Sequence, residues 1–336
     1  MTKKLLNIAK IAFFIGLGIL LVWIVLQNLT DKDIEEIKIA FYEANYWWIG
    51  VSILVGAISH LFRAMRWKLL LQTMQHKPSL ANTFFSVMVG YLANTAVPRL
   101  GEVSRCGVLT RYEKIPFEES FGTVVAERLI DTLTFFLLFL FIVWYQFDKI
   151  FGYANQKVFS PLLAKFPFLI KPTFWILIAI VGVLGITILY FLNKRKKKNQ
   201  DKKQSKLANL LTGFAKGLVT VKTVKQPFLF WTYSVAIWFF YFLNMLLSFY
   251  AFEQTSVLSP SVALACMTFG TFAFIAVQGG IGAYPLIVME VLGLFGVASS
   301  VGYAFGWVAW CASTLVILLL GFLSLLLLPL VNKKVN

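Results

Sequence analysis

The stretch TFFSVMVGYLANTA (residues 83–96) has the composition of a membrane helix, and VPRLGEVSRCGV (residues 97–108) interrupts it with a proline, two arginines and a glutamate. Proline has no backbone N–H and disfavours helix at the residue before it, so the helix is expected to stop at Val97. We expect Gly101 to let the backbone turn before a second, shorter helix begins. The chain therefore breaks a helix where an apolar run would simply end.

Three charged residues follow this break: Arg99, Glu102 and Arg105. Their three-residue steps would place them along one side of the second helix. Charge at membrane depth is unfavourable unless it faces a partner or a cavity, so we interpret the three residues as a headgroup site. The alternative is a cytoplasmic loop at the level of the lipid headgroups.

The composition of the whole chain decides the class of protein. Of 336 residues 59% are hydrophobic and only 14% are charged, and the mean hydropathy is +0.77. These values exclude a soluble globular domain. The apolar runs lack the alternation of barrel strands, so they are expected to be α-helices that satisfy their own backbone hydrogen bonds. The predicted fold is an all-α polytopic integral membrane protein.

Six apolar runs are long enough to span a membrane, and two more are broken by glycine. We predict six full spans and two re-entrant helical hairpins, in residues 80–128 and 259–300. The predicted spans are 11–26, 47–61, 129–147, 174–192, 228–252 and 305–328.

Basic residues predict the orientation of these spans. If both hairpins return to the side from which they enter, most of the 31 lysines and arginines share one side with both termini. Cytoplasmic segments carry such an excess, so both termini are predicted to be cytoplasmic. Residues 1–336 then form a single membrane domain, with halves 1–192 and 227–336 joined by a basic cytoplasmic segment, 193–226.

The lysine run Lys194–Lys206 is interpreted as a solvated loop that fixes this topology, with contact to anionic lipid as the alternative. Residues 207–225 after it show the spacing of an interfacial amphipathic helix. Residues 30–45 form a weaker counterpart on the outer side. No binding to nucleic acid is expected.

The two broken runs resemble each other. NTAVPRLGE, beginning at Asn94, and FIAVQGGIGAY, beginning at Phe274, both place an Ala-Val pair before a glycine turn and a shorter helical stretch. In the predicted topology they enter from opposite sides, as an inverted repeat would. Irregular backbone at membrane depth occurs only inside protein or beside a watery cavity, so the breaks are candidate substrate sites.

Two further charged sets lie near the first break. Arg63 and Arg66 share a helix face, and anchoring at the membrane interface is the alternative to a role in a site. Glu127 and Asp131 are one turn apart, with Arg128 between them. Carboxylates at that spacing repel, so they are expected to share a cation, to hold a proton, or to form an internal salt bridge with a nearby arginine.

Four blocks, RAMRWKLLL, NTAVPRLGEVSR, AERLIDTL and QGGIGAY, together resemble the lysylphosphatidylglycerol synthase transmembrane-region family, whose best-known member is the multiple peptide resistance factor. The resemblance implies re-entrant helices and translocation of aminoacylated phospholipid. It also implies a set of substrate-binding residues. These are Arg63, Arg66, Asn94, Arg99, Glu102, Arg105, Glu127, Arg128, Asp131, Gln278, Gly279, Gly280 and Gly282, with Pro98 and Gly101 in the same blocks.

The sequence departs from that family at two positions. Gln278 stands where the family usually has proline, and Pro285 where it usually has glutamate, so the resemblance implies no step that needs this acid. The family's lipid aminoacylation belongs to a soluble domain after the membrane region, and the sequence ends a few residues beyond its last predicted span. No synthase activity is therefore expected.

We interpret the chain as a flippase-like translocase of a phospholipid or a lipid-linked substrate in a bacterial-type cytoplasmic (inner) membrane. The alternatives are a membrane-embedded lipid-modifying enzyme and a non-catalytic scaffold. Three cysteines and two histidines without paired spacing indicate no disulfide framework and no metal, and no cofactor or ATP-binding motif is present. The expected partners are anionic or aminoacylated membrane lipids, and a second copy or a partner membrane enzyme.

Overall fold

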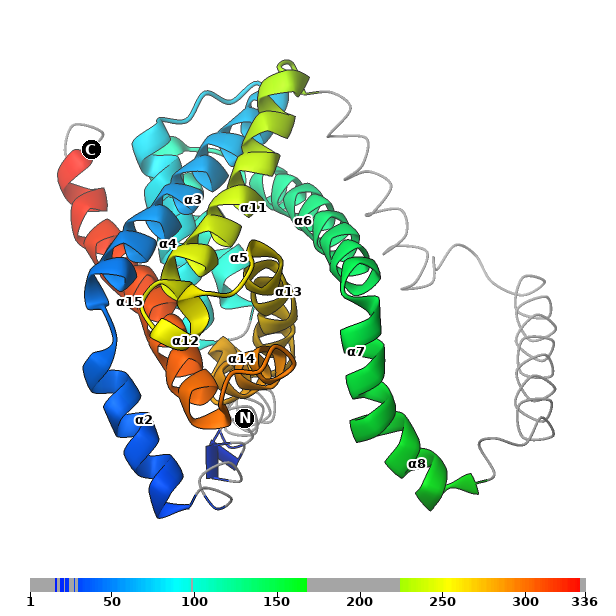
Figure 1. The fold of residues 1–336 in the computed structure, drawn as a ribbon. Coiled ribbons are helices and arrows are strands. Elements are labelled where there is room, and N and C mark those ends of the chain that lie inside the picture. Colours follow the sequence, from blue (N-terminus) through cyan, green and yellow to red (C-terminus); the bar gives the residue numbers. More distant parts are fainter. Residues whose placement is uncertain are drawn as a thin grey trace, which may run out of the picture. The chain divides into compact units, whose positions relative to one another are not determined.

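The structure is a computed structural model that describes residues 30–97, 99–167 and 224–332, and isolated positions between 16 and 27. Every secondary-structure element in these ranges is a helix (Figure 1). The chain divides into a first unit, residues 1–142 with 216–336, and a second unit, residues 143–215. Four predicted segments lie wholly or largely outside the described residues: 11–26, 174–192, 194–206 and 207–225.

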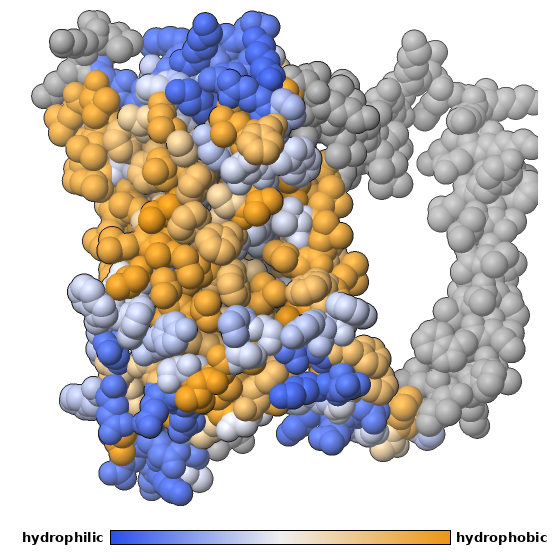
Figure 2. All heavy atoms as spheres, turned by 45° about the horizontal axis from the view of Figure 1, so that its top comes forward, coloured by the Kyte–Doolittle hydropathy of each residue, from blue (hydrophilic) through white to orange (hydrophobic). Residues whose placement is uncertain are grey.

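The first unit contains long helices: α3 (Tyr46–Thr73), α11 (Pro227–Phe249), α15 (Ser299–Val331) and most of α6 (Phe117–Tyr145). Helices α3, α11 and α15 are long and apolar enough to cross a membrane, and a fourth crossing results if α6 is counted with the helical segment after it. At 1.5 Å per residue each exceeds the ~30 Å of a hydrocarbon core. Apolar side chains cover the middle of the unit's visible face, and hydrophilic ones gather at its two ends (Figure 2).

Shorter helices complete the described chain. Helix α2 begins with a capping box, in which Thr30 Oγ1 accepts from the Asp33 N–H and the Asp33 carboxylate accepts from the Thr30 N–H. The first unit holds α2 (Asp31–Glu43), α4 (Leu80–Ala96), α5 (Leu100–Glu113), α12 (Glu253–Ser256), α13 (Pro260–Ala276), η3 (Gln278–Gly280) and α14 (Ala283–Gly293). The second holds α7 (Phe147–Ala154), η1 (Asn155–Phe159) and α8 (Ser160–Lys165).

Helices α4 and α5 form an antiparallel hairpin. At its base, the Glu113 carboxylate accepts hydrogen bonds from the Ser79 N–H, at 3.0 Å, and from the Asn82 amide, at 2.6 Å. At its tip, Asn94 Oδ1 accepts from the Gly101 N–H at 2.7 Å. The chain therefore returns at residue 113 to the level at which it entered the hairpin.

Helices α13 and α14 form a second hairpin. Near its tip, the Tyr284 ring lies against Gly270, where a Cβ would approach the ring to 2.8 Å. The same ring packs in a tilted arrangement beside Phe274, with 5.2 Å between ring centroids. At its base, the Ala298 N–H donates to Gln254 Oε1 at 3.3 Å. The chain therefore leaves this hairpin, too, at the level at which it entered.

The two hairpins break in the same way. Val97 and Val277 end their first helices in extended conformation, with φ/ψ of −140°/126° and −127°/138°, and each N–H donates to the carbonyl four residues earlier at 2.9 Å. Two residues later, Arg99 and Gly279 adopt left-handed conformations of 63°/5° and 65°/5°. The predicted helix end at Val97 is confirmed, and the breaks are repeats of one another in backbone geometry.

Helix α15 shows that the hairpins enter from opposite ends of the first unit. Near its start, Gly302 packs on α14, and one third along its length the Trp310 indole donates to the Gly279 carbonyl at 2.7 Å. At its end, Asn332 exchanges hydrogen bonds of 2.8 and 2.9 Å with Asn82 at the base of the first hairpin. We call this end the Asn82 end, and the opposite one, where the Asn45 N–H bonds to the Ala251 carbonyl, the Asn45 end.

The order of helices repeats with inverted direction. A long helix, a 17-residue helix, a break, a shorter helix and a long helix occur as α3–α4–α5–α6 and again as α11–α13–α14–α15. Helices α3 and α11 are antiparallel, because the start of α3 bonds to the segment after α11 while Arg66, late in α3, bonds to Ser234, early in α11. The described helices thus have the inverted-topology arrangement that the two glycine breaks predicted.

The hairpin geometry predicts which residues are reached from the same side of a membrane. In a variant without the natural cysteines, single cysteines at Lys77 and Lys114 should react with an impermeant thiol reagent from one side, because both flank the first hairpin at the Asn82 end. A cysteine at Tyr42, which is 90% exposed on α2, should react from the other side. Labelling of Lys77 and Lys114 positions from opposite sides would contradict a re-entrant hairpin.

Candidate functional site

Five charged side chains from three helices form what we call the buried charge cluster: Arg63, Arg66, Arg105, Glu127 and Asp131. Arg63 Nη1 lies 2.8 Å from Glu127 Oε1 and 2.5 Å from an Asp131 oxygen. Arg66 Nη2 lies 2.7 Å from the other Asp131 oxygen. Arg105 Nη2 lies 3.2 Å from Glu127 Oε2. None of the five residues is more than 8% exposed.

The helical spacing of the sequence brings the cluster together. Arg63 and Arg66 are three residues apart on α3, and Glu127 and Asp131 are four apart on α6, so each pair shares a helix face. Two acids on one face therefore meet two arginines on another, and Arg105 of α5 adds a third cation. Of the arrangements expected for Glu127 and Asp131, the structure shows internal salt bridges with arginine. The alternative for Arg63 and Arg66, anchoring at the membrane interface, is wrong because both side chains are buried.

Neutral side chains hold the guanidinium groups in place. The Tyr241 hydroxyl accepts from Arg63 Nη2 at 3.3 Å, and Ser234 Oγ accepts from Arg66 Nη1 at 3.4 Å. Trp67 lies with its ring 4.5 Å from the Arg105 guanidinium carbon, a cation–π distance, while its Nε1–H donates to Thr123 at 2.9 Å. No local sequence pattern points to Tyr241, Ser234 or Thr123, whereas Trp67 stands directly beside Arg66 in the chain.

The charges beside the first break do not form one set. Arg105 points into the buried cluster, whereas Arg99 is exposed and forms no ion pair with any residue that the structure describes. Glu102 instead pairs with Arg128 of α6 at 3.0 Å, with side chains 22% and 43% exposed. The expectation that Arg99, Glu102 and Arg105 lie along one side of the second helix is therefore wrong, because Arg99 precedes α5.

Gly101 has another role than the expected turn. The left-handed residue at the break is Arg99, and Gly101 lies in the first turn of α5. A Cβ on Gly101 would lie 2.2 Å from the Gly90 carbonyl oxygen and 2.6 Å from the Asn94 side chain. Gly101 is therefore a close-packing residue that lets α4 and α5 touch along their backbones.

A small cavity lies between the first hairpin and α6, with room for about one water molecule. Buried nitrogens of the two arginines that line it, Arg105 Nε and Arg128 Nε, have no hydrogen-bond partner among the described residues. Arginines also outnumber acids in this region. Its four buried or partly buried arginines are Arg63, Arg66, Arg105 and Arg128, and its three acids are Glu102, Glu127 and Asp131. The site thus has guanidinium donors and positive charge left over for an anion.

The second hairpin reaches this region with its tip. Gly279, Gly280 and Gly282 all have φ between 65° and 71°, a conformation that other residues rarely adopt. The Gln278 amide donates to the carbonyl oxygen of Asn94, so the two tips are in direct contact. Pro285, at the other departure from the family pattern, packs its backbone against Gly306 of α15.

Within the described ranges, no three histidine, cysteine or acidic side chains are placed to hold a metal ion. The chemistry that these residues support is reversible binding of an anionic group by arginine. Of the predicted site residues, the structure gathers Arg63, Arg66, Arg105, Glu127 and Asp131 in the buried cluster. Around the tips it places Asn94, Arg99, Glu102, Arg128, Gln278, Gly279, Gly280 and Gly282.

Comparison with known proteins gives two matches. The family described as the lysylphosphatidylglycerol synthase TM region matches residues 7–330. The UPF0104 membrane protein MJ1595 of Methanocaldococcus jannaschii is 24% identical over 139 residues, which cover 40% of this chain and 41% of that relative. The match thus spans about two fifths of the length of the relative. No solved structure matches the chain significantly.

Proposed function

Because the chain belongs to the lysylphosphatidylglycerol synthase transmembrane-region family, we propose that this multi-pass membrane protein moves a phospholipid or a lipid-linked substrate across the bilayer. In this proposal the protein is not an enzyme, and its partner is an anionic or aminoacylated phospholipid. The headgroup passes the tips of the two hairpins while the acyl chains stay in the surrounding lipid.

One observation carries the proposal: charged side chains are accessible at the hairpin tips, far from either end of the long helices. The Arg99 side chain is exposed, and those of Glu102 and Arg128 are 22% and 43% exposed. The tips lie beside Trp310, well inside the length of α15. Accessible charge at this depth is tolerated where it faces a watery cavity, which is what a headgroup path requires.

The unpaired arginine nitrogens support an anionic headgroup. A guanidinium binds phosphate through two parallel hydrogen bonds, and the Nε atoms of Arg105 and Arg128 are buried without a hydrogen-bond partner among the described residues. Arg99, exposed and left-handed at the break, is suited to receive the headgroup first. From Arg99 the headgroup would pass to Arg105, so that its negative charge stays beside a guanidinium group.

The small cavity implies that the tips separate during transport. It has room for about one water molecule, far less than a headgroup needs. The tips are linked by the hydrogen bond between Gln278 and Asn94. Such a bond contributes only about 1 kcal/mol, so thermal motion is sufficient to break it.

We also propose that the Asn82 end faces the cytoplasm of a bacterial-type inner membrane, with both chain termini on that side. At the Asn45 end, acidic side chains of α2 outnumber its two lysines, Lys32 and Lys38. The Asn82 end carries Lys68, Lys77 and Lys114. An excess of basic residues is characteristic of cytoplasmic segments.

Purified protein in liposomes tests the proposal. Fluorescent phosphatidylglycerol should cross from one leaflet to the other faster in these liposomes than in protein-free ones, with no new lipid species by mass spectrometry. Chemical conversion of the lipid would instead show a membrane-embedded enzyme. Absence of both, with folded and inserted protein, would leave a scaffold and contradict the translocase.

A further inference from the structure

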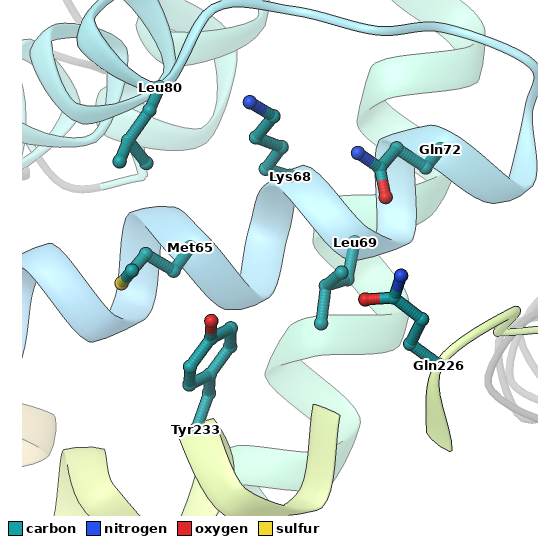
Figure 3. Close-up of a pocket in the computed structure, with 7 residues that line it drawn as sticks. All are labelled: Met65, Lys68, Leu69, Gln72, Leu80, Gln226 and Tyr233. Atoms are coloured by element: carbon teal, nitrogen blue, oxygen red, sulfur yellow. The ribbon is translucent and has the colours of Figure 1, made fainter. Parts of the chain in front are cut away.

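A second pocket lies away from the hairpin tips, at the Asn82 end between α3, α4 and the start of α11. Its volume is about 210 Å³. Figure 3 shows seven residues around it, and these fall into two kinds. The apolar ones are Met65, Leu69 and Leu80, and the polar ones are Lys68, Gln72, Gln226 and Tyr233.

The polar side chains around this pocket are not engaged by any described residue. Lys68 forms no ion pair or hydrogen bond with any residue that the structure describes, and the side chains of Gln72, Gln226 and Tyr233 likewise have no described partner for their polar atoms. Figure 3 shows the Tyr233 hydroxyl and the Gln226 amide projecting from the α11 side toward α3, which carries Lys68 and Gln72. The pocket therefore offers one ammonium, two amides and a hydroxyl, and none of the described residues that line it is acidic.

The beginning of α11 adds to the positive potential. Helix α11 starts at Pro227, directly after Gln226 on the rim of the pocket, and the Gln226 side chain makes no capping hydrogen bond to its first turn. The N–H groups of an uncapped first turn and the positive end of the helix dipole favour an anion. Lys68 and the residue before this helix end both line the pocket.

The size and surroundings of the pocket indicate which anion it holds. A volume of about 210 Å³ is below the roughly 300–1,000 Å³ of pockets for drug-sized molecules, so it suits a headgroup and not a whole lipid. The first turns of α11 also expose Phe228 at 84% and Trp231 at 52%. Exposed aromatic side chains beside the polar end of a membrane helix are typical of the lipid interface.

We propose that this pocket binds the phosphate of an anionic membrane phospholipid, with Lys68 as the cation and the Gln72, Gln226 and Tyr233 side chains as hydrogen-bonding partners. The acyl chains remain outside, in the bilayer. The site is separate from the hairpin tips, and its existence does not depend on translocation.

Native mass spectrometry of purified protein tests this site with dioleoyl-phosphatidylglycerol as the probe. Lys68→Gln should lower the fraction of protein that retains this lipid about tenfold, because a charge-assisted hydrogen bond to phosphate is lost. Lys68→Arg should retain it. Lys77→Gln is the matched control, since Lys77 is an exposed lysine at the same end but outside the pocket.

Measurements of the melting temperature distinguish binding of a lipid phosphate from binding of free inorganic phosphate. Phosphatidylglycerol should raise the melting temperature of the wild type and of Lys77→Gln, but not of Lys68→Gln, while inorganic phosphate should raise none of them. Equal lipid retention by Lys68→Gln and wild type would overturn the site. Stabilisation by inorganic phosphate as strong as that by the lipid would overturn the lipid assignment. Neither result depends on the liposome transport assay.

Discussion

Replacing Glu127 with glutamine should lower the free energy of unfolding by about 3–5 kcal/mol, the usual effect of removing one partner from a buried ion pair. Glu127 is fully buried and lies within 3.5 Å of guanidinium nitrogens of Arg63, Arg66 and Arg105. Glutamine keeps its shape and removes the charge, leaving three buried cations with one carboxylate. The measurement is an SDS titration of purified protein in mixed micelles, followed by tryptophan fluorescence.

A second substitution shows whether the Glu127→Gln variant loses stability through unbalanced charge or through altered packing. Adding Arg105→Gln to Glu127→Gln should recover part of the lost stability, because it removes one of the unbalanced cations, whereas the two losses would add if each side chain acted alone. Glu118→Gln is the control, a removal of charge at the start of the same helix. A Glu127→Gln protein as stable as wild type would show that the cluster does not hold α3, α5 and α6 together.

Gly101→Ala should destabilise the protein by about 3 kcal/mol, since overpacking at rigid backbone is poorly relieved. The new methyl group would lie 2.2 Å from the Gly90 carbonyl oxygen, so α5 must move away from α4. That movement would also stretch the hydrogen bond from the Gly101 N–H to Asn94 at the hairpin tip. Unfolding in the same SDS titration measures the loss.

Gly107→Ala is the matched control, because Gly107 lies in the same helix with nothing within 4 Å of its Cβ position. Alanine favours helix over glycine by about 1 kcal/mol, so this variant should be slightly more stable than wild type. If both variants gain stability, the close contact between α4 and α5 does not exist in the folded protein.

The fold was predictable where backbone chemistry acts locally. Pro98 predicts that the helix ends at Val97, and α4 ends one residue earlier, at Ala96. The Ala-Val pairs and glycines predict two related breaks, and the breaks have the same backbone conformation. The long apolar runs predict α3, α11 and α15, because length and hydropathy alone decide whether a helix spans a bilayer.

The pairing of charges was not predictable from one sequence. Glu127 and Asp131 were known to share a helix face, but which arginines they contact depends on how α3, α5 and α6 pack. Spacing within α5 placed Arg99 and Arg105 on one side, whereas Arg99 is left-handed and lies before the helix begins. Contacts made by neutral residues, such as that of the Tyr241 hydroxyl with Arg63, correspond to no local pattern in the sequence.

The central claim, that accessible charge at the hairpin tips receives a lipid headgroup, is tested most directly at Arg99. This arginine is exposed and has no described ion pair, so Arg99→Gln should leave folding unchanged. In liposomes, it should slow the transbilayer movement of fluorescent phosphatidylglycerol about tenfold, the effect of losing one charge-assisted contact. Arg111→Gln, at the other end of α5, should transport at the wild-type rate. Wild-type transport by Arg99→Gln at equal protein insertion would contradict the claim.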